Sequence, residues 1–163
     1  MVHATADGGV ALSILGPVAA SINGMNLTVA TEYPFGDALD ISVTGAAAGT
    51  PLLVRVPGWA TNATFALNGA AAQPLGPNGT MARIALAGAA GGDAVHIELN
   101  PAIFVDSVGV LYNGAVSVHR GALVFGLSLG ETVNVTATHE CPAVDHPLIA
   151  DYTINSTTPW NVA

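Results

Sequence analysis

The chain has 163 residues, the size of one ordinary domain with a core of its own. Hydrophobic residues make up 51% of it and charged residues only 9%, a composition that excludes an intrinsically disordered chain. Three basic residues oppose eleven acidic ones, for a formal net charge of -8, so we expect nucleic-acid backbones and anionic lipid surfaces to be repelled.

The single cysteine, Cys141, excludes an intramolecular disulfide, so the fold must rest on packing. We predict no membrane span, because glycine, proline and charged residues interrupt every apolar run before it is long enough. Residues 1–7 lack the positive and apolar regions of a secretion signal. The protein is therefore expected either to be cytosolic or to have its natural start further upstream.

Short segments rich in β-branched and apolar residues recur along the chain, and each is closed by Gly, Pro or Asn. No 3.6-residue pattern is sustained for three turns, so helices are not indicated. These features are typical of an antiparallel sandwich or barrel. We predict an all-β fold, a jelly-roll-like antiparallel β-sandwich with little or no helix, as a single domain over 1–163.

Four segments alternate apolar and polar residues, which is the pattern of a strand with one buried and one wetter face. They are 39–44, 52–56, 64–67 and 95–100. In the second of them, Arg55 lies on the side opposite the apolar residues.

Asn-Gly pairs at 68–69, 78–79 and 113–114 supply the positive φ that tight hairpin turns require, and they predict β-turns. The Ala- and Gly-rich stretches 45–49 and 87–92 are predicted to be loops, since Gly costs about 1 kcal/mol at each helical position.

The region after Glu131 is predicted to be less regular, because it combines three prolines with clustered Thr, Asn and His. Within it His139, Cys141 and His146 offer three metal-ligating side chains. Structural zinc sites usually recruit paired ligands from two separated segments, whereas two prolines here indicate an extended loop. We favour an ordinary loop and predict no metal or cofactor in this chain.

Candidate catalytic groups are sparse. Glycoside hydrolysis needs two carboxyl groups about 5 Å apart for retention or about 6.5–9.5 Å apart for inversion. Asp37 and Asp40 would point to opposite faces of a strand, and Glu98 is interpreted as part of a solvated strand face beside His96. No oriented base accompanies Cys141. We therefore predict no catalytic residue.

Two tryptophans, Trp59 and Trp160, are candidate sugar contacts, because an aromatic ring packs well on the apolar C–H face of a sugar. The alternative is structural. Trp59 follows Pro57-Gly58 at a predicted strand end, where a large ring commonly closes one end of a sandwich core.

Five tripeptides have the form of N-glycosylation acceptors, where about one is expected by chance. Their acceptor residues are Asn26, Asn62, Asn78, Asn134 and Asn155. They favour a protein of the secretory pathway, although a Thr-rich β sequence with Asn in its turns explains them equally well.

Several segments together resemble one known family. In chain order they are Tyr33-Pro34-Phe35-Gly36, Leu53 to Ala60, the Asn68-Gly69 turn, His119 to Phe125, and Thr158 to Asn161. In this order and approximate spacing they are similar to the β-sandwich region of glycoside hydrolase family 127, the β-L-arabinofuranosidase type.

The resemblance implies that catalysis belongs to an (α/α)6 helical barrel that precedes the sandwich. In that barrel a Cys thiolate held by zinc is the proposed nucleophile, and a Glu is the acid/base. Zinc would thus belong to the barrel, and Cys141 matches no catalytic motif of the family. We expect the chain to be a fragment of a larger glycosidase that lacks this barrel.

Arg55 is predicted to be semi-buried and to form a structural ion pair with Glu32 or Asp37 that fixes a strand end. A domain with so few charges is also expected to be covered by a neighbour, and a helical barrel packed on one sheet would do this.

We therefore expect a non-catalytic accessory domain that supports the barrel and shapes one rim of its sugar pocket. Alone, the chain is not expected to hydrolyse glycosides. Its expected partners are the barrel of the parent protein and arabinose-containing glycans. The alternative is a free-standing carbohydrate-binding or cell-surface adhesion module.

Overall fold

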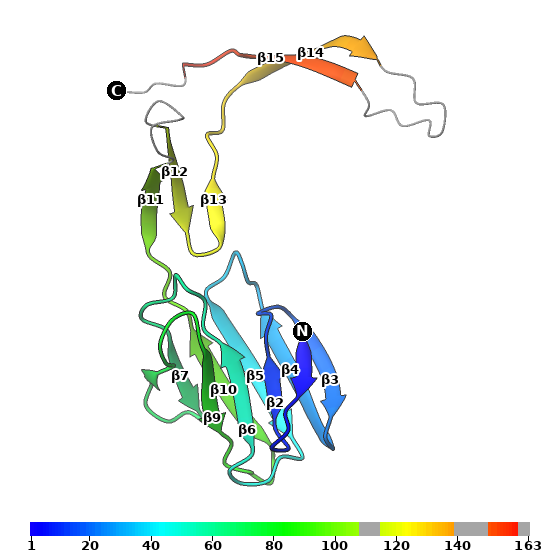
Figure 1. Ribbon diagram of the computed structural model, residues 1–163, viewed down its shortest axis with the longest axis vertical. Coiled ribbons are helices and arrows are strands. Elements are labelled where there is room, and N and C mark those ends of the chain that lie inside the picture. The colour runs from blue at the N-terminus through cyan, green and yellow to red at the C-terminus, as the bar shows by residue number, and fades with distance from the viewer. Residues whose placement is uncertain (108–114, 139–149, 160–163) are drawn as a thin grey trace. The chain divides into compact units, whose positions relative to one another are not determined.

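The computed structural model describes residues 1–107, 115–138 and 150–159. Within these ranges the chain forms β-strands and turns and no helix (Figure 1). It divides into two compact units, Met1–Phe125 and Gly126–Ala163. The prediction of a single domain over 1–163 stays a prediction. In the described part of the chain there is no helix of the length and apolarity that a membrane crossing demands.

The first unit contains two large sheets and one small one. The four-stranded sheet has the order β1 (Val2–Ala4), β2 (Val10–Leu12), β6 (Pro51–Arg55) and β9 (Met81–Ala85). The six-stranded sheet has the order β3 (Val18–Ile22), β4 (Met25–Thr31), β5 (Ala38–Thr44), β10 (Asp93–Glu98), β7 (Thr64–Leu67) and β8 (Gln73–Pro74). The small sheet has the order β11 (Ile103–Ser107), β12 (Val116–Arg120) and β13 (Leu123–Phe125).

The all-β sandwich prediction is confirmed, with one difference in strand direction. Strands β2 and β6 run parallel, with Val10 opposite Leu52, while the other pairs of described strands are antiparallel. Parallel neighbours need a crossover connection. Here the crossover consists of β3, β4 and β5, which belong to the opposite sheet.

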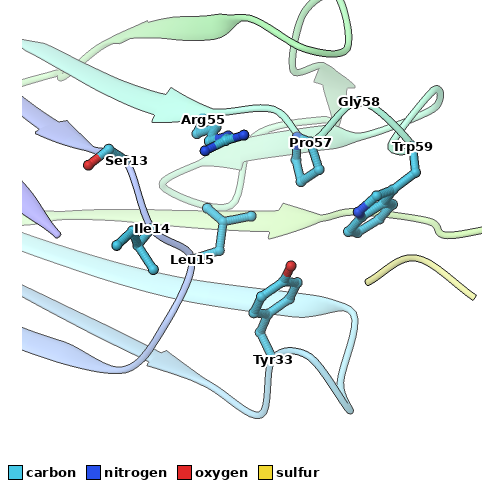
Figure 2. Close-up of a pocket in the computed structure, with 8 residues that line it drawn as sticks. All are labelled: Ser13, Ile14, Leu15, Tyr33, Arg55, Pro57, Gly58 and Trp59. Atoms are coloured by element: carbon cyan, nitrogen blue, oxygen red, sulfur yellow. The ribbon is translucent and has the colours of Figure 1, made fainter. Parts of the chain in front are cut away.

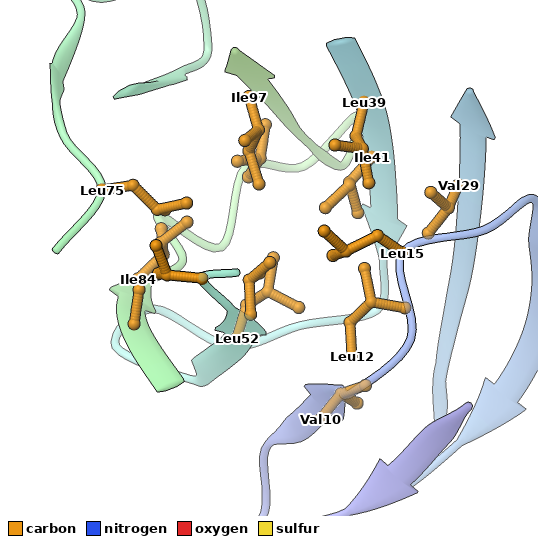
Figure 3. Close-up of a cluster of buried hydrophobic side chains, with 14 of the residues drawn as sticks. Val10, Leu12, Leu15, Val29, Leu39, Ile41, Leu52, Leu75, Ile84 and Ile97 are labelled. Carbon is orange, nitrogen blue, oxygen red and sulfur yellow. The ribbon is translucent and has the colours of Figure 1, made fainter. Parts of the chain in front are cut away.

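Apolar side chains from both large sheets meet in one core (Figure 3). In β5 the side chains of Leu39, Ile41 and Val43 are buried and those between them are exposed, as the alternation predicted. The same alternation holds in β10 and around Arg55 in β6. Each Leu, Ile or Val buried in this way contributes about 1.5–3 kcal/mol, so the facing strands are the main source of stability.

Strand β7 shows a weaker contrast than its sequence predicted, because all four of its residues are half-buried. Phe65 and Leu67 still pack against the core. The loops predicted at 45–49 and 87–92 are both present.

The predicted turn at Asn68-Gly69 follows β7, and both residues have positive φ, 53° and 73°. The turn at 78–79 is also present, and the pair at 113–114 lies outside the described residues. The structure adds a turn that the sequence interpretation overlooked. Asn23-Gly24, with φ of 52° and 76°, joins β3 to β4 as a two-residue hairpin.

The second unit contains β14 (Glu131–Thr138) and β15 (Ala150–Ser156), paired antiparallel with a bulge between Val135 and Ala137. The expectation of an irregular segment after Glu131 is thus wrong for these residues. Of the prolines that suggested irregularity, Pro142 and Pro147 lie outside the described residues, and Pro159 follows β15. Within β14, five of the eight residues are β-branched Thr or Val, which favour extended backbone.

A buried carboxylate ties the Asn68-Gly69 turn to the start of β10. Asp93 is 3% exposed, and it accepts hydrogen bonds from the Asn68 side-chain amide (2.7 Å) and the Gly88 backbone N–H (2.8 Å). Burial acts to raise the pKa of Asp93, but these donors and the N–H groups of Ala89 and Ala87 outweigh it, so its pKa is lowered. Asn68 in turn accepts from the Ala94 N–H at 2.8 Å.

We predict that Asp93→Asn lowers the free energy of unfolding by about 2 kcal/mol, because an amide group would face the Gly88 N–H donor. Since the folded-state pKa lies below 3.8, this carboxylate contributes stability above that pH, and the contribution is lost as the pH falls through the lowered pKa. Urea unfolding measured from neutral to acid pH tests both points. The exposed Asp106→Asn is the control, and an equal loss in that variant would contradict the prediction.

Candidate functional site

A pocket of about 320 Å³ lies at one end of the sandwich (Figure 2). Its walls come from the segment after β2, the end of β6 with the loop that follows it, and the loop after β4. The lining residues are Ser13, Ile14, Leu15, Tyr33, Arg55, Pro57, Gly58 and Trp59. Aromatic, apolar and cationic side chains therefore surround one space.

Local hydrogen bonds fix the two loops that carry the aromatic rings. The Thr31 hydroxyl accepts from the Tyr33 N–H (3.0 Å) and donates to the Ala38 carbonyl (2.7 Å), which closes the loop between β4 and β5. The loop after β6 is held by the Asn78 side-chain amide, which donates to the Gly58 carbonyl at 2.6 Å. Both rings are thus presented by anchored backbone.

The prediction that Arg55 forms an ion pair with Glu32 or Asp37 is wrong. Arg55 is exposed, and within residues 1–107, 115–138 and 150–159 it forms no ion pair. Asp37 instead accepts a hydrogen bond from the Arg120 guanidinium, and both side chains are 31% exposed. The outward side of β6, where Arg55 lies, was inferred correctly from the alternation. Its acidic partner depended on chain folding that the alternation does not encode.

Segments far apart in the sequence meet at this end of the sandwich. The Arg120–Asp37 pair joins the end of β12 to the loop before β5. Gly121 is buried with φ +58°, and a side chain there would lie 3.1 Å from the Cβ of Pro101 and 3.3 Å from the Trp59 ring. Three of the family-like segments, at 33–36, 53–60 and 119–125, therefore form one cluster.

We predict that Gly121→Ala lowers the free energy of unfolding by about 1–2 kcal/mol, because the new methyl group needs a left-handed backbone and presses on Trp59. Denaturant unfolding measures this loss. The control is Gly58→Ala, whose new methyl group meets nothing within 4 Å and should change stability by no more than about 0.5 kcal/mol. Equal effects of the two variants would refute the packing role of Gly121.

Trp59 combines both interpretations made from the sequence. It is partly buried against the core and also lines the pocket. Its use as a sugar contact stays a prediction. Trp160 lies outside the described residues, as does the segment with His139, Cys141 and His146.

On the outer face of the six-stranded sheet, His96 lies between two carboxylates. Its Nδ1 is 2.7 Å from Asp40 Oδ1 and its Nε2 is 3.1 Å from Glu98 Oε1. The hydrogen bond with Asp40, and then that with Glu98, raises the pKa of His96. This cluster is solvated, since the His96 side chain is 47% exposed. Neither these three side chains nor any other group of His, Cys, Asp or Glu among the described residues has an arrangement that could hold a metal ion.

All five acceptor asparagines are exposed, so each side chain reaches solvent. Asn26 lies in β4, Asn134 in β14 and Asn155 in β15. Asn62 and Asn78 lie in loops, and the Asn78 amide is already hydrogen-bonded to Gly58. Glycosylation of these residues stays a prediction.

Sequence reasoning missed Asp93 and Arg120 as structural residues. Asp93 follows Gly91-Gly92 directly before an alternating strand, a position where a turn-anchoring carboxylate could have been suspected. The Arg120–Asp37 pair spans 83 positions, and no local pattern signals it.

Solved structures show that this is a fold found in glycoside hydrolases. One, described as a glycoside hydrolase, has a TM-score of 0.61 and 22% identity, over 72% of this chain and 21% of its own. A GH127 β-L-arabinofuranosidase from Geobacillus stearothermophilus has a TM-score of 0.55 and 17% identity, over 94% and 31%. A second GH127 β-arabinofuranosidase has a TM-score of 0.57 and 16% identity, over 93% and 29%. The chain thus spans less than a third of the length of each.

The family model described as "Beta-L-arabinofuranosidase, GH127 middle domain" matches residues 10–100, more than half of the chain. These residues include β2 to β10 and the pocket. The chain therefore belongs to the GH127 middle-domain family, and the resemblance drawn from its motifs is confirmed. A search of curated proteins finds no match.

Proposed function

We propose that this chain is a non-catalytic accessory domain of a glycoside hydrolase of the β-L-arabinofuranosidase type. In this proposal it packs against the catalytic (α/α)6 barrel of its parent protein and shapes one rim of the sugar pocket there. The family match supports the assignment. The much greater length of the solved relatives supports a parent protein with further domains.

The observation that carries the proposal is the exposed apolar surface of the small sheet β11–β13. Every residue of β11 is exposed, including Ile103 at 67% and Val105 at 61%. Val116 in β12 and Val124 in β13 are exposed to a similar extent. The sandwich core, by contrast, is closed, with many side chains under 2% exposed.

Among the described residues, this sheet has little of the cover that small sheets need. A few strands become stable when an apolar face packs on another element, and contiguous exposed apolar residues mark interaction surfaces. Successive side chains of a strand point to opposite faces of the sheet. Ile103 and Val105 therefore share one face of β11, and Phe104, whose ring stacks on His119, lies on the other. Both faces of β11 therefore offer apolar area to a neighbour, and the proposed barrel would supply the cover.

The first prediction concerns activity. The purified chain should not hydrolyse an aryl β-L-arabinofuranoside, because the proposal assigns both catalytic groups to the barrel. Release of the aryl alcohol, followed by absorbance, measures this, with a complete GH127 enzyme as the positive control. Turnover by the chain alone, lost on Glu98→Gln, would show that the domain is itself catalytic.

The second prediction concerns packing. In the isolated chain, Val105→Glu should change the free energy of unfolding by no more than about 0.5 kcal/mol, because Val105 is exposed there. In the parent protein, read from the DNA upstream of the Met1 codon, the same change should cost about 2 kcal/mol or more, because it buries a charge at the interface.

Met81→Glu is the matched control, since Met81 is an apolar residue of the sandwich that is 40% exposed. It should be tolerated in both contexts. Equal tolerance of Val105→Glu in both contexts, or upstream DNA that encodes no helical Cys- and Glu-bearing domain, would contradict the proposal.

A second candidate function is a free-standing carbohydrate-binding or cell-surface adhesion module. The pocket favours it, because Tyr33 and Trp59 line the same space and aromatic rings pack on sugars. Binding of the isolated chain to arabinose-containing glycans would favour this function over the accessory role.

A further inference from the structure

The pocket beside Trp59 holds a cation, Arg55, that has no ion-pair partner among the described residues. Two of the three arginines are ion-paired: Arg83 with Asp7 at 2.7 Å, and Arg120 with Asp37. Arg55 forms no ion pair within the described part of the chain, although acidic residues outnumber basic ones eleven to three. Where carboxylates are in such excess, an unpaired guanidinium on a pocket wall suits a carboxylate brought by a ligand.

The other walls suit the body of a sugar. In Figure 2 the Arg55 guanidinium, the Tyr33 hydroxyl and the Trp59 indole border the same space, and Ile14 and Leu15 line the side opposite Trp59. An indole face attracts the C–H side of a sugar ring, and a tyrosine hydroxyl donates to or accepts from ring hydroxyls.

The volume limits the size of the ligand. At about 320 Å³ the pocket is at the small end of ligand-binding cavities, which suits one ring better than an oligosaccharide. A single ring could occupy the space between Trp59 and Tyr33 while reaching Arg55.

We propose that this pocket binds a single sugar acid, a uronate residue. Its carboxylate pairs with the Arg55 guanidinium, its C–H face packs on Trp59, and a ring hydroxyl hydrogen-bonds to Tyr33. The pocket would act in the same way in an accessory domain and in a free-standing module.

The net charge of the chain makes Arg55 decisive for selectivity between an acidic sugar and a neutral one. A net charge of -8 disfavours anions near the surface. This repulsion is screened beyond about 8 Å at physiological salt, whereas a direct guanidinium–carboxylate contact is not. Preference for an acid over the matched neutral sugar must therefore come from the contact with Arg55.

The test uses the full 163-residue chain and isothermal titration with four probes: D-galacturonate, the matched neutral D-galactose, L-arabinose and acetate. Galacturonate should bind about tenfold more tightly than galactose or arabinose, and also more tightly than acetate, which has the charge but no ring. Tyr33→Phe should weaken galacturonate binding by about threefold to tenfold, the loss of one hydrogen bond.

Arg55→Met should reduce the affinity for galacturonate to that for galactose, with denaturant unfolding unchanged because Arg55 is exposed. Arg83→Met is the matched control, since it removes the same charge from another exposed arginine outside the pocket. It should leave galacturonate binding intact.

Four results would overturn the proposal. An equal loss of galacturonate affinity in Arg55→Met and Arg83→Met would show that the net charge, and not contact with Arg55, causes the effect. Acetate binding as tight as galacturonate would show a carboxylate site with no sugar recognition, such as one for an acidic side chain of a protein partner. Tighter binding of arabinose than of galacturonate would make it a neutral-sugar site. No binding of galacturonate up to about 20 mM would exclude a sugar-acid site.

Discussion

Contact between the apolar faces of the two large sheets is the interaction on which the rest of the first unit depends. Leu39, Ile41 and Val43 from one sheet meet Leu52 and its neighbours from the other in a core closed to water. Because this core is rigid and densely packed, the loops at its ends inherit fixed positions. The pocket lies on such loops and strand ends, and Asp37, the partner of Arg120, lies in one of these loops.

The end of the sandwich near Trp59 concentrates features that are scattered in the sequence. The Trp59 side chain packs against the core and lies beside Gly121, and it also lines the pocket together with Arg55. A tryptophan in this position has a structural and a recognition surface at once. The choice made from sequence, between a ring that closes the core and a ring that meets a sugar, therefore separated two roles that this geometry allows together.

The sequence predicted what depends on local alternation and missed what depends on distant contacts. The buried faces of β5, β6 and β10 follow from a two-residue period, which a single strand displays by itself. The partner of Asp37 depends on how the chain returns after many strands, and the guess of Arg55 was wrong for that reason. The Asn23-Gly24 turn is a different kind of miss, because its signal was present in two adjacent residues.

The parallel pairing of β2 with β6 has a consequence for synthesis of the protein. Val10 in β2 pairs with Leu52 in β6, and the strands between them in the sequence, β3 to β5, belong to the opposite sheet. During synthesis β2 therefore leaves the ribosome before β6, the strand with which it pairs. Strand β1, which pairs with β2, also precedes β6. Closure of the four-stranded sheet is therefore a non-local step, because it joins strands that are separated in the sequence by three strands of the other sheet.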